Sequence, residues 1–285
     1  MLLAPVRALR PHDVGEEAPT AACPFCPGNE DQTPPTCAAA GDGPTGWGAR
    51  AFPNKYPAID PAEGAHEVIV NSPRHILRLG DLTDDEADRA VGLWAARLAA
   101  VAADARGLWP FLFLNQGAAA GASLQHTHTQ IVGLPFAPPR LVTRERVAAA
   151  APGCPVCADI AGAGERTVID DGSGLVAFCP EVPPLSGTLR IAPVTHVPDW
   201  APGVDVAALG RVLPACARAV GAAIGGEALN LWLHERGPGG TDRRHWHIDM
   251  LPRIGTLAGM ELGAGVIAVA LGPKDTAARL RAALV

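Results

Sequence analysis

The stretch Asn115-Gln-Gly-Ala-Ala-Ala-Gly-Ala-Ser-Leu-Gln-His-Thr-His-Thr-Gln130 decides how the chain folds around a site. The apolar residues 111–114 before it predict a strand that leads into a loop of small residues. Such a loop lets backbone N–H groups approach phosphate oxygens closely. If residues 126–130 form a strand, His126, His128 and Gln130 share one face. The stretch favours a phosphate site with a nucleophile; the alternative is a small-residue turn before a strand with two incidental histidines.

Length, composition and charge set limits on the fold and the partners. The 285 residues are 48% hydrophobic and suffice for one large domain or two smaller ones. The formal net charge of -6 disfavours nonspecific binding to nucleic acid or to an anionic membrane. The apolar run at the N-terminus is too short for a signal peptide. No later stretch reaches the roughly 18 to 20 apolar residues that a membrane-spanning helix needs. We therefore expect a cytoplasmic protein.

The sequence contains an internal repeat, which determines the predicted architecture. The interval from Asn115 to His128 is 13 residues, and so is the interval from His234 to His247. Other landmarks recur in the same order. We predict an α+β fold with two halves, residues 1–137 and 138–285, each an antiparallel sheet with one long helix. The first-half landmarks are Cys23/Cys26, Ala51-Phe52, His75 and His126-x-His128, matched by Cys154/Cys157, Ala177-Phe178, His196 and His245-x-His247.

Periodicity and turn residues predict the individual elements. Thr83 followed by Glu86 forms a capping box, and apolar residues then recur at helical spacing up to residue 101. Residues 138–153 are interpreted as a segment that crosses between the halves. The β-branched or apolar runs predict strands at residues 49–52, 67–71, 175–178, 187–192, 228–234, 247–251 and 266–271, and alanine-rich runs predict helices at 204–224 and 274–284.

Two Cys-x-x-Cys pairs predict two metal sites. Zinc commonly takes two thiolates and two imidazoles, and four such ligands leave no open position, so the sites would be structural. A thioredoxin-type redox pair would need a strand-to-helix context that neither pair clearly has. We predict two zinc ions per chain, one held by Cys23, Cys26, His75 and His126 and one by Cys154, Cys157, His196 and His245.

With His126 assigned to a metal, His128 is predicted to be the nucleophile. A neutral imidazole attacks phosphorus well and forms a reactive phosphoramidate. Gln130, helped by Ser123 and the loop amides, would stabilise charge on a phosphate oxygen. In the second half Asp249 takes the place of Gln130 and His234 that of Asn115. Because a carboxylate would repel a phosphate, we predict one active nucleophile and a second half that serves as scaffold and substrate wall.

Ordered motifs over nearly the whole chain resemble the galactose-1-phosphate uridylyltransferase family of the histidine-triad superfamily. The resemblance implies a duplicated histidine-triad-like fold and a homodimer. The motifs are Ala4-Pro-Val-Arg-Ala-Leu-Arg-Pro11, Cys23-Pro-Phe-Cys-Pro-Gly28, Pro53-Asn-Lys-Tyr-Pro57, Asn71-Ser-Pro-Arg-His75, the stretch 115–130, His245-Trp-His-Ile-Asp-Met-Leu-Pro-Arg253 and Thr256-Leu-Ala-Gly-Met-Glu-Leu-Gly263.

The same resemblance implies roles for individual residues. His128 would become nucleotidylated and Gln130 would stabilise that intermediate. A nucleotide-sugar would first give its nucleotidyl group to His128, and a sugar 1-phosphate would be released. A second phosphate compound would then bind and accept the nucleotidyl group from His128. The implied substrate-binding residues are Ser123 and Asn115 at the phosphates, Arg7, Arg10 and Asn54 in the nucleotide pocket, and Glu261 at the sugar hydroxyls.

The residues of the histidine motif do not decide which substrate the protein uses. His126-Thr-His-Thr-Gln130 is closer to the branch with His-Ser-His-Ser-Gln, which includes ADP-glucose phosphorylase, than to the His-Pro-His-Gly-Gln typical of uridylyltransferases. We expect a UDP-glucose:hexose-1-phosphate uridylyltransferase of galactose metabolism, with ADP-glucose phosphorylase, which uses phosphate as acceptor, as the alternative. A histidine-triad hydrolase with water as acceptor, and a catalytically silent zinc-stabilised nucleotide-binding module, are the other hypotheses.

Overall fold

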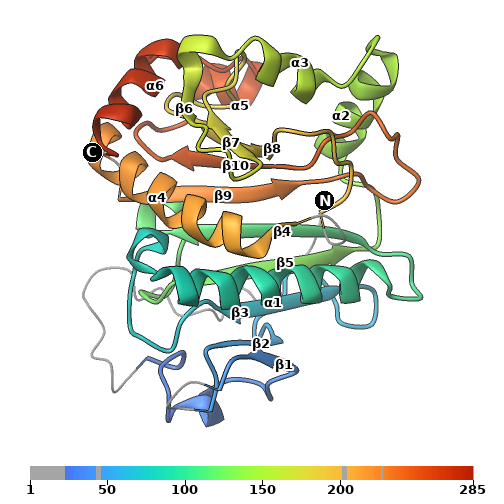
Figure 1. The fold of residues 1–285 in the computed structure, drawn as a ribbon. Coiled ribbons are helices and arrows are strands. Elements are labelled where there is room, and N and C mark those ends of the chain that lie inside the picture. Colours follow the sequence, from blue (N-terminus) through green and yellow to red (C-terminus); the bar gives the residue numbers. More distant parts are fainter. Residues whose placement is uncertain (1–22, 43–45, 201–203, 226, 285) are drawn as a thin grey trace.

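The described part of the chain forms one antiparallel sheet of ten strands (Figure 1). The computed structural model describes residues 23–42, 46–200, 204–225 and 227–284. Short 3-10 turns lie before the first strand, at η3 (Glu30–Gln32), and between later strands, at η4 (Leu79–Asp81), η5 (Ala118–Ala120) and η6 (Gly164–Arg166). The strands are β1 (Ala38–Ala40), β2 (Ala49–Pro53), β3 (Ala65–Val70), β4 (Trp109–Gln116), β5 (His128–Leu134), β6 (Thr167–Ile169), β7 (Leu175–Phe178), β8 (Leu189–Pro193), β9 (Leu229–His234) and β10 (His247–Pro252).

The order of the strands is the same when the sheet is followed inward from either edge. It runs β1-β2-β3-β5-β4-β9-β10-β8-β7-β6, so each strand of the first half has a counterpart in the second. The halves meet where β4 pairs antiparallel with β9, with Phe113 opposite Trp232 and Asn115 opposite Asn230. This arrangement confirms the predicted α+β class and its duplication. The sheet continues without a break across the predicted boundary between residues 137 and 138.

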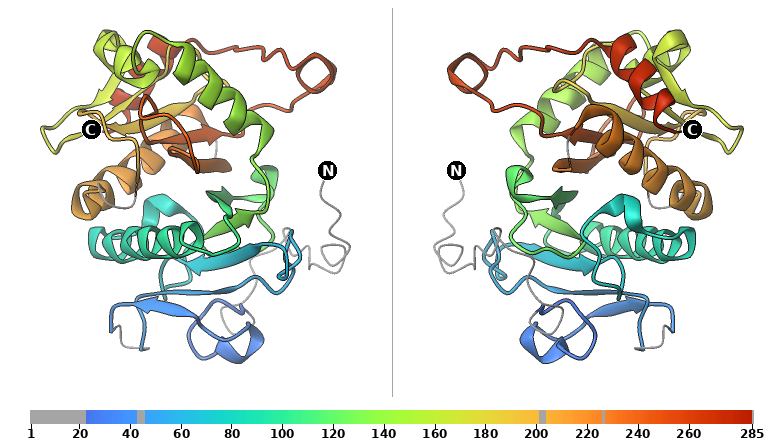
Figure 2. Two further views of the ribbon diagram at one scale, coloured as in Figure 1. Left: turned by 90° about the vertical axis from the view of Figure 1, so that its right-hand side faces the viewer. Right: turned by 90° about the vertical axis from the view of Figure 1, so that its left-hand side faces the viewer.

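Two long helices cover the same face of the sheet. Helices α1 (Asp84–Ala102) and α4 (Val206–Ile224) lie side by side on it (Figures 1 and 2). The predicted capping box is confirmed, because Thr83 Oγ1 accepts from the Glu86 backbone and Glu86 Oε2 accepts from the Thr83 backbone. The apolar faces of both helices and the side chains beneath them form one core that includes Trp94 and Trp246. Helix α6 (Pro273–Ala282) packs against α4.

Helix α4 is long and apolar enough, by length and composition alone, to cross a membrane. The sequence-based expectation that no such stretch exists was wrong by this criterion. In the structure 56% of that stretch is buried inside the protein. Its buried side chains, among them Leu209, Leu213 and Val220, pack in the core. A helix that covers a sheet in this way is apolar because it lies in the core.

Alternation along β5 sends its side chains to opposite faces. Thr129 and Ile131 point toward α1, and Ile131 is part of the core beneath it. His128 and Gln130 therefore lie on the other face, which α1 and α4 leave open. There a smaller apolar cluster contains Phe25, Phe52, Val68 and Val70. The chemistry predicted from the sequence thus lies on the face opposite the two long helices.

Some elements differ from the predictions. Strand β5 begins at His128 rather than at residue 126. The crossing segment contains a helix, α2 (Pro139–Ala150), and the shorter α3 (Pro155–Ala161) follows the second cysteine pair. The predicted strand at residues 266–271 is wrong, because these residues form no regular element. They belong to an arm, residues 254–271, that contains α5 (Gly259–Ala264) and extends away from the body of the molecule (Figure 2).

Candidate active site and metal centres

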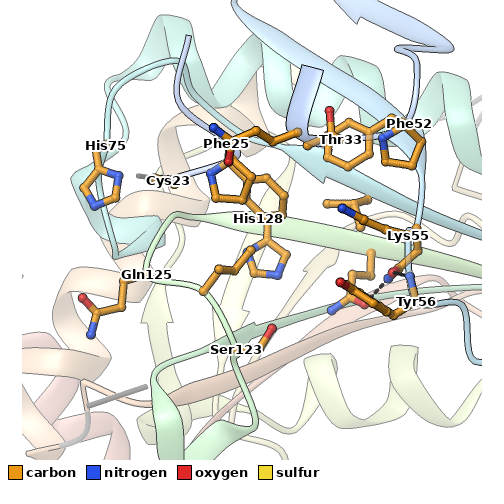
Figure 3. Close-up of a pocket in the computed structure, with 17 residues that line it drawn as sticks. Cys23, Phe25, Thr33, Phe52, Lys55, Tyr56, His75, Ser123, Gln125 and His128 are labelled. Carbon is orange, nitrogen blue, oxygen red and sulfur yellow. Dashed lines mark hydrogen bonds between the residues drawn. The ribbon is translucent and has the colours of Figure 1, made fainter. Parts of the chain in front are cut away.

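A cavity of about 470 Å³ opens beside β5, with His128 in its wall. The His128 ring points into it between Phe25 and Ser123 (Figure 3). The His128 side chain is nevertheless only 4% exposed, since the Phe25 ring packs edge-on against it at 5.2 Å between centroids. Other lining residues include Pro24, Gln32, Thr33, Pro34, Phe52, Asn54, Lys55, Tyr56, Val68, Leu124, Gln125 and Gln130. The volume is in the range of small-molecule sites.

The backbone fixes the tautomer of His128. Its Nδ1 lies 2.7 Å from the carbonyl oxygen of His126. A carbonyl oxygen only accepts, so Nδ1 must be the protonated nitrogen that donates this bond. The lone pair of the neutral ring is then on Nε2, the nitrogen farther from the backbone. This is the form of imidazole that a nucleophilic role needs.

The carbonyl of the Gln130 side chain is also fixed. Its Oε1 lies 3.0 Å from His66 Nε2 and 3.5 Å from Asn54 Nδ2. His66 Nδ1 accepts from the Ala58 backbone N–H at 2.9 Å, so His66 Nε2 is the protonated nitrogen that donates to Gln130. With Oε1 held in this way, the Gln130 NH₂ group is directed away from His66. It can serve as a donor to an anion bound at His128.

A second, smaller cavity of about 260 Å³ adjoins the first. It shares Leu124, Gln125 and His128 with it, so His128 lies where the two cavities meet. Asn115, Gly117 and Ala118 line its other side. Gly117 and Gly121 both adopt positive φ values, 77° and 84°, which glycine adopts without strain. The small-residue loop therefore turns tightly around this second cavity.

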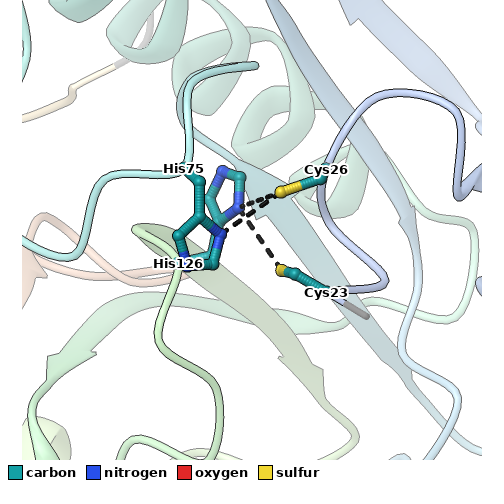
Figure 4. A group of neighbouring side chains, drawn as sticks. All are labelled: Cys23, Cys26, His75 and His126. Carbon is teal, nitrogen blue, oxygen red and sulfur yellow. Dashed lines mark hydrogen bonds between the residues drawn. The ribbon is translucent and has the colours of Figure 1, made fainter. Parts of the chain in front are cut away.

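Four residues predicted as metal ligands in the first half lie together (Figure 4). The ligand atoms of Cys23, Cys26, His75 and His126 are all within 4.8 Å of one another. His75 Nδ1 is 3.2 Å from Cys26 Sγ, and His126 Nδ1 is 3.6 Å from Cys23 Sγ. Burial lowers the pKa of His126 to about 4, so its imidazole is neutral near pH 7. Two thiols and two imidazoles fit the donor set of a tetrahedral metal ion.

The remaining nitrogen of His126 has a partner of its own. Its Nε2 lies 2.9 Å from the carbonyl oxygen of Ser72 and donates to it. Nδ1 of the neutral ring is then left to face the cysteines. Metal-bound histidines usually have such a partner on their second nitrogen, which fixes the orientation of the ring. His126 and His128 are thus held by different nitrogens and face different neighbours.

The predicted ligands of the second half also form a cluster. The ligand atoms of Cys154, Cys157, His196 and His245 lie within 4.8 Å of one another. Both histidines place Nδ1 at 3.3 Å from Cys157 Sγ. Cys154 Sγ accepts from the Cys157 backbone N–H, and His196 Nε2 donates to the Asp242 carbonyl oxygen at 2.7 Å. His196 is exposed, so this cluster is more open to solvent than the first.

The other predicted residues are placed as follows. Ser123 and Asn54 line the larger cavity and Asn115 the smaller one. Glu261 lies on α5 in the arm and lines neither cavity at His128. Arg7 and Arg10 lie outside the residues that the structure describes, as does the motif at residues 4–11.

Sequence reasoning did not single out His66 or Phe25. His66 lies on β3, the neighbour of β5, and Val68 two residues later is directly opposite Gln130. The side chains of His66 and Gln130 meet only because of this register. Alternation along a predicted β3 would have placed His66 and Val68 on one face, but the pairing with β5 was needed to connect them to the site.

Comparison with known proteins finds relatives of similar sequence. Residues 49–138 match the family described as galactose-1-phosphate uridyl transferase, N-terminal domain. An ADP-glucose phosphorylase from Arabidopsis thaliana is 25% identical over 99% of this chain and 89% of its own length. A galactose-1-phosphate uridylyltransferase from Streptomyces lividans is 27% identical, but the match covers 67% of this chain and 53% of that protein.

A solved structure extends the comparison to three dimensions. The crystal structure of the Arabidopsis thaliana ADP-glucose phosphorylase with bound ADP-glucose superimposes with a TM-score of 0.84 at 25% identity, covering 98% of this chain and 93% of that one. These relatives are enzymes that act on nucleotide sugars. The chain is therefore similar, in sequence and in fold, to the nucleotide-sugar enzymes of the galactose-1-phosphate uridylyltransferase family.

Proposed function

We propose that the protein transfers a nucleotidyl group from a nucleoside diphosphate sugar to a phosphate acceptor through a covalent intermediate on His128. The observation that supports this most directly is the tautomer of His128, whose Nδ1–H donates to the His126 carbonyl oxygen and leaves the lone pair on Nε2. His128 also lies where two cavities meet, so a substrate with two parts can extend to either side of it.

The reaction has two displacements at the same phosphorus. His128 Nε2 attacks the α-phosphorus of the nucleotide sugar; a P–N bond forms and the bond from that phosphorus to the bridging oxygen breaks. Sugar 1-phosphate leaves with the electron pair. A phosphate oxygen of the acceptor then attacks the α-phosphorus, and the P–N bond breaks to restore His128. The NH₂ group of Gln130 donates to a nonbridging oxygen as negative charge builds there.

The two cavities differ in the part of the substrate that they suit. The larger one is lined by Phe25, Phe52 and Val68, which offer apolar and aromatic surface to a base. The smaller one has the glycine turn and Asn115, which offer polar groups to a phosphate and a sugar. We place the nucleoside in the larger cavity and the sugar phosphate in the smaller one.

Two substrate pairs are candidates. UDP-glucose with a hexose 1-phosphate is the pair expected from the sequence, and the match to the uridylyltransferase family model supports it. ADP-glucose with inorganic phosphate is supported by the similarity to ADP-glucose phosphorylase over nearly the whole chain. The second pair has the more extensive support, because the curated uridylyltransferases match only part of the chain.

A single-turnover experiment tests the mechanism and separates the two bases. The protein is incubated with ADP-glucose or UDP-glucose without an acceptor. We expect release of up to one glucose 1-phosphate per chain and the mass of AMP or UMP added to His128, because the first displacement needs no acceptor. His128→Ala should fold normally, judged by circular dichroism, and form no adduct. If the wild type forms no adduct with either compound but binds nucleotides, the silent binding module is the correct hypothesis.

Adding acceptors to the labelled protein identifies the second substrate. Inorganic phosphate would release ADP or UDP, and galactose 1-phosphate would release a nucleotide sugar. Release of AMP or UMP at the same rate without either compound would instead support the hydrolase.

We also propose that each Cys₂His₂ cluster holds one zinc ion. The donor set supports this, and in the first cluster so does the partner of the His126 Nε2. Such an ion would join the segment with Cys23 and Cys26 to the start of β5. It would act as a structural support, because four protein ligands leave no open position for a substrate.

We further propose that the protein is a homodimer in which the arm contacts the second copy. The arm exposes several apolar side chains that a monomer would leave in water, namely Ile254, Met260, Leu262, Val266 and Val269. Glu261 lies on the same arm, away from the cavities of its own chain. An arm that reaches a second copy could bring Glu261 to the sugar in that copy.

A further inference from the structure

The second half has a cavity of its own, of about 210 Å³, where the duplication would place a counterpart of the catalytic cavity. His247 lines it as His128 lines the first, and Pro155 and Val156 of the second cysteine pair take the places of Pro24 and Phe25. His247 Nδ1 donates to the His245 carbonyl oxygen at 2.9 Å, the same arrangement as in His128. The backbone of the first site is thus repeated here, but the side chains differ.

Four arginines line this second cavity: Arg144, Arg190, Arg243 and Arg244. They come from three separate segments, since Arg144 lies on α2, Arg190 on β8, and the other two immediately before β10. Glu145 Oε1 lies 3.1 Å from Arg244 Nε. Such a concentration of guanidinium groups is unexpected in a chain with a net charge of -6.

The carboxylate that replaces Gln130 is fully engaged. Asp249 is completely buried and accepts from Arg190 through both oxygens, at 2.7 and 3.0 Å. Arg190 holds the pKa of Asp249 well below its usual range against the opposing effect of burial. The sequence-based argument that this carboxylate would repel a phosphate does not hold, because the adjacent guanidinium neutralises it.

Arg144 reaches from α2 across the cavity to His247. Its Nη1 lies 3.4 Å from His247 Nε2 and donates to it, and its Nη2 lies 3.9 Å from Asp249 Oδ2. Burial lowers the pKa of Arg144 to about 10, and the guanidinium groups of Arg190 and Arg244 act in the same direction. Arg144 lies where a phosphorus atom would have to be for His247 Nε2 to attack it. His247 is therefore not a second nucleophile.

Among the residues that the structure describes, the charges around the cavity do not balance. Four guanidinium groups lie near three carboxylates, those of Asp249, Glu145 and Asp159. Asp159 is 3.8 Å from Arg190 but only 2.8 Å from Arg166, which lies outside the cavity and also pairs with Glu181 at 3.1 Å. Excess positive charge held in a partly buried space attracts an anion.

We propose that this arginine-lined cavity binds a phosphate-type oxyanion at a second site, separate from the catalytic cavity. The ligand is inorganic phosphate or the phosphate group of a small sugar phosphate. The volume is below that of the usual drug-sized sites and excludes a whole nucleotide sugar. Arg243 Nη1 already donates to the carbonyl oxygens of Ala149 and Ala151, at the end of α2. An ion held by Arg144 and by the other N–H groups of Arg243 would reinforce this link between α2 and the segment before β10. The proposal does not depend on the catalytic reaction.

Binding of radiolabelled inorganic phosphate, measured by equilibrium dialysis on the full chain, tests this site. Arg144→Gln and Arg243→Gln should each weaken the affinity for phosphate at this cavity about tenfold or more, because each removes a charge-assisted hydrogen bond. Phosphate binding at any other site should be unchanged. Arg146→Gln is the matched control, since Arg146 lies on the same helix, is exposed and does not line this cavity. A parallel series with glucose 1-phosphate shows whether the free ion or the ester is preferred. Arg243→Gln serves if Arg144→Gln fails to fold, because Arg243 is on the surface.

A crystal soaked in tungstate, a tetrahedral oxyanion with a strong anomalous signal, locates the ion. We expect a peak among the four arginines in the wild type and none there in Arg144→Gln. Phosphate binding that is identical in the wild type and both variants would overturn the proposal, and so would tungstate found only at His128. Loss of nucleotide transfer in His128→Ala, with this peak unchanged, would show that the two sites are independent.

Discussion

Gln130 depends on His66 for its orientation, although the two residues are 64 positions apart. Without the His66 N–H, only the longer contact with Asn54 Nδ2, at 3.5 Å, holds the Gln130 oxygen. The amide can then rotate more easily and present its oxygen to a phosphate, which would repel it. The Ala58 backbone N–H in turn sets the tautomer of His66. A backbone amide thus determines, through two side chains, which end of Gln130 faces the site.

His66→Ala is therefore expected to lower kcat about tenfold or more with a smaller change in KM, because it misplaces a donor that acts on the transition state. Gln130→Ala should cost about a hundredfold or more. The double variant should be no slower than Gln130→Ala, since His66 acts through that residue. Equal and additive losses from the two changes would show that His66 has a separate role. Steady-state kinetics with the substrate pair found above provide the measurement.

At this scale the sequence singled out candidate residues for the chemistry but not the residues that position them. His126 and His128 were given different predicted roles from the donor types and their spacing, and the structure places the two rings in different surroundings. His66 could not be found in this way, because its contact with Gln130 depends on the pairing of β3 with β5. The Arg144 contact with His247 depends likewise on the path of α2.

Among the elements, α1 and α4 pack closely enough to leave no room for a side chain at Gly210. A Cβ at this position would overlap Asp88 Oδ1 and lie 3.1 Å from the Asp88 backbone nitrogen. Gly221, on the same helix, has nothing within 4 Å of such an atom. The two glycines therefore have the same helical backbone but different surroundings.

This difference predicts opposite effects of the same substitution. Gly210→Ala should lower the free energy of unfolding by about 1 to 3 kcal/mol, since the added methyl group overpacks the contact with α1. Gly221→Ala should raise it by about 0.5 to 1 kcal/mol, because alanine favours the helix. Urea denaturation measures both. If Gly210→Ala stabilises the protein as much as Gly221→Ala does, α1 and α4 are farther apart than described.

Elements with a strong periodicity of apolar residues were predicted well. Elements whose structure depends on where the segment lies in the fold were not. Helix α1 follows from its capping box and its apolar spacing. Helix α2 has one buried residue, Ala148, so its sequence has no clear apolar face. Residues 266–271 are apolar enough for a strand, but they lie on the arm, where they pair with no strand in the described structure. Apolar side chains there indicate a contact with another surface rather than an element of this sheet.

For the molecule as a whole, the two Cys₂His₂ clusters predict different consequences of metal loss. The wild type should contain about two zinc ions per chain by metal analysis, and Cys23→Ser and Cys154→Ser about one each. Cys23→Ser should also abolish most of the His128 adduct, because the first cluster holds the residue two before His128. Cys154→Ser should lower the melting temperature but retain the adduct. No zinc in protein purified without chelators would contradict both assignments.

A substitution in the arm tests the proposed dimer. Leu262→Asp, at a side chain that is 72% exposed, should convert a dimer into a monomer, because a charge replaces an apolar contact. Val182→Asp is the control, since Val182 is also exposed but lies outside the arm. Size-exclusion chromatography with light scattering gives the molar mass. A wild type that elutes as a monomer would refute the dimer, while dimers in both variants would place its interface elsewhere.

The pairing of β4 with β9 limits how the chain can be shortened. These strands are the inner edges of the two halves, and each satisfies the backbone hydrogen bonds of the other. A fragment that stopped between the halves would leave Leu114 and its neighbours on an open, apolar edge, which is a template for aggregation. The smallest piece that closes this sheet therefore includes strands from both halves, even though the predicted catalytic groups His128 and Gln130 both lie in the first.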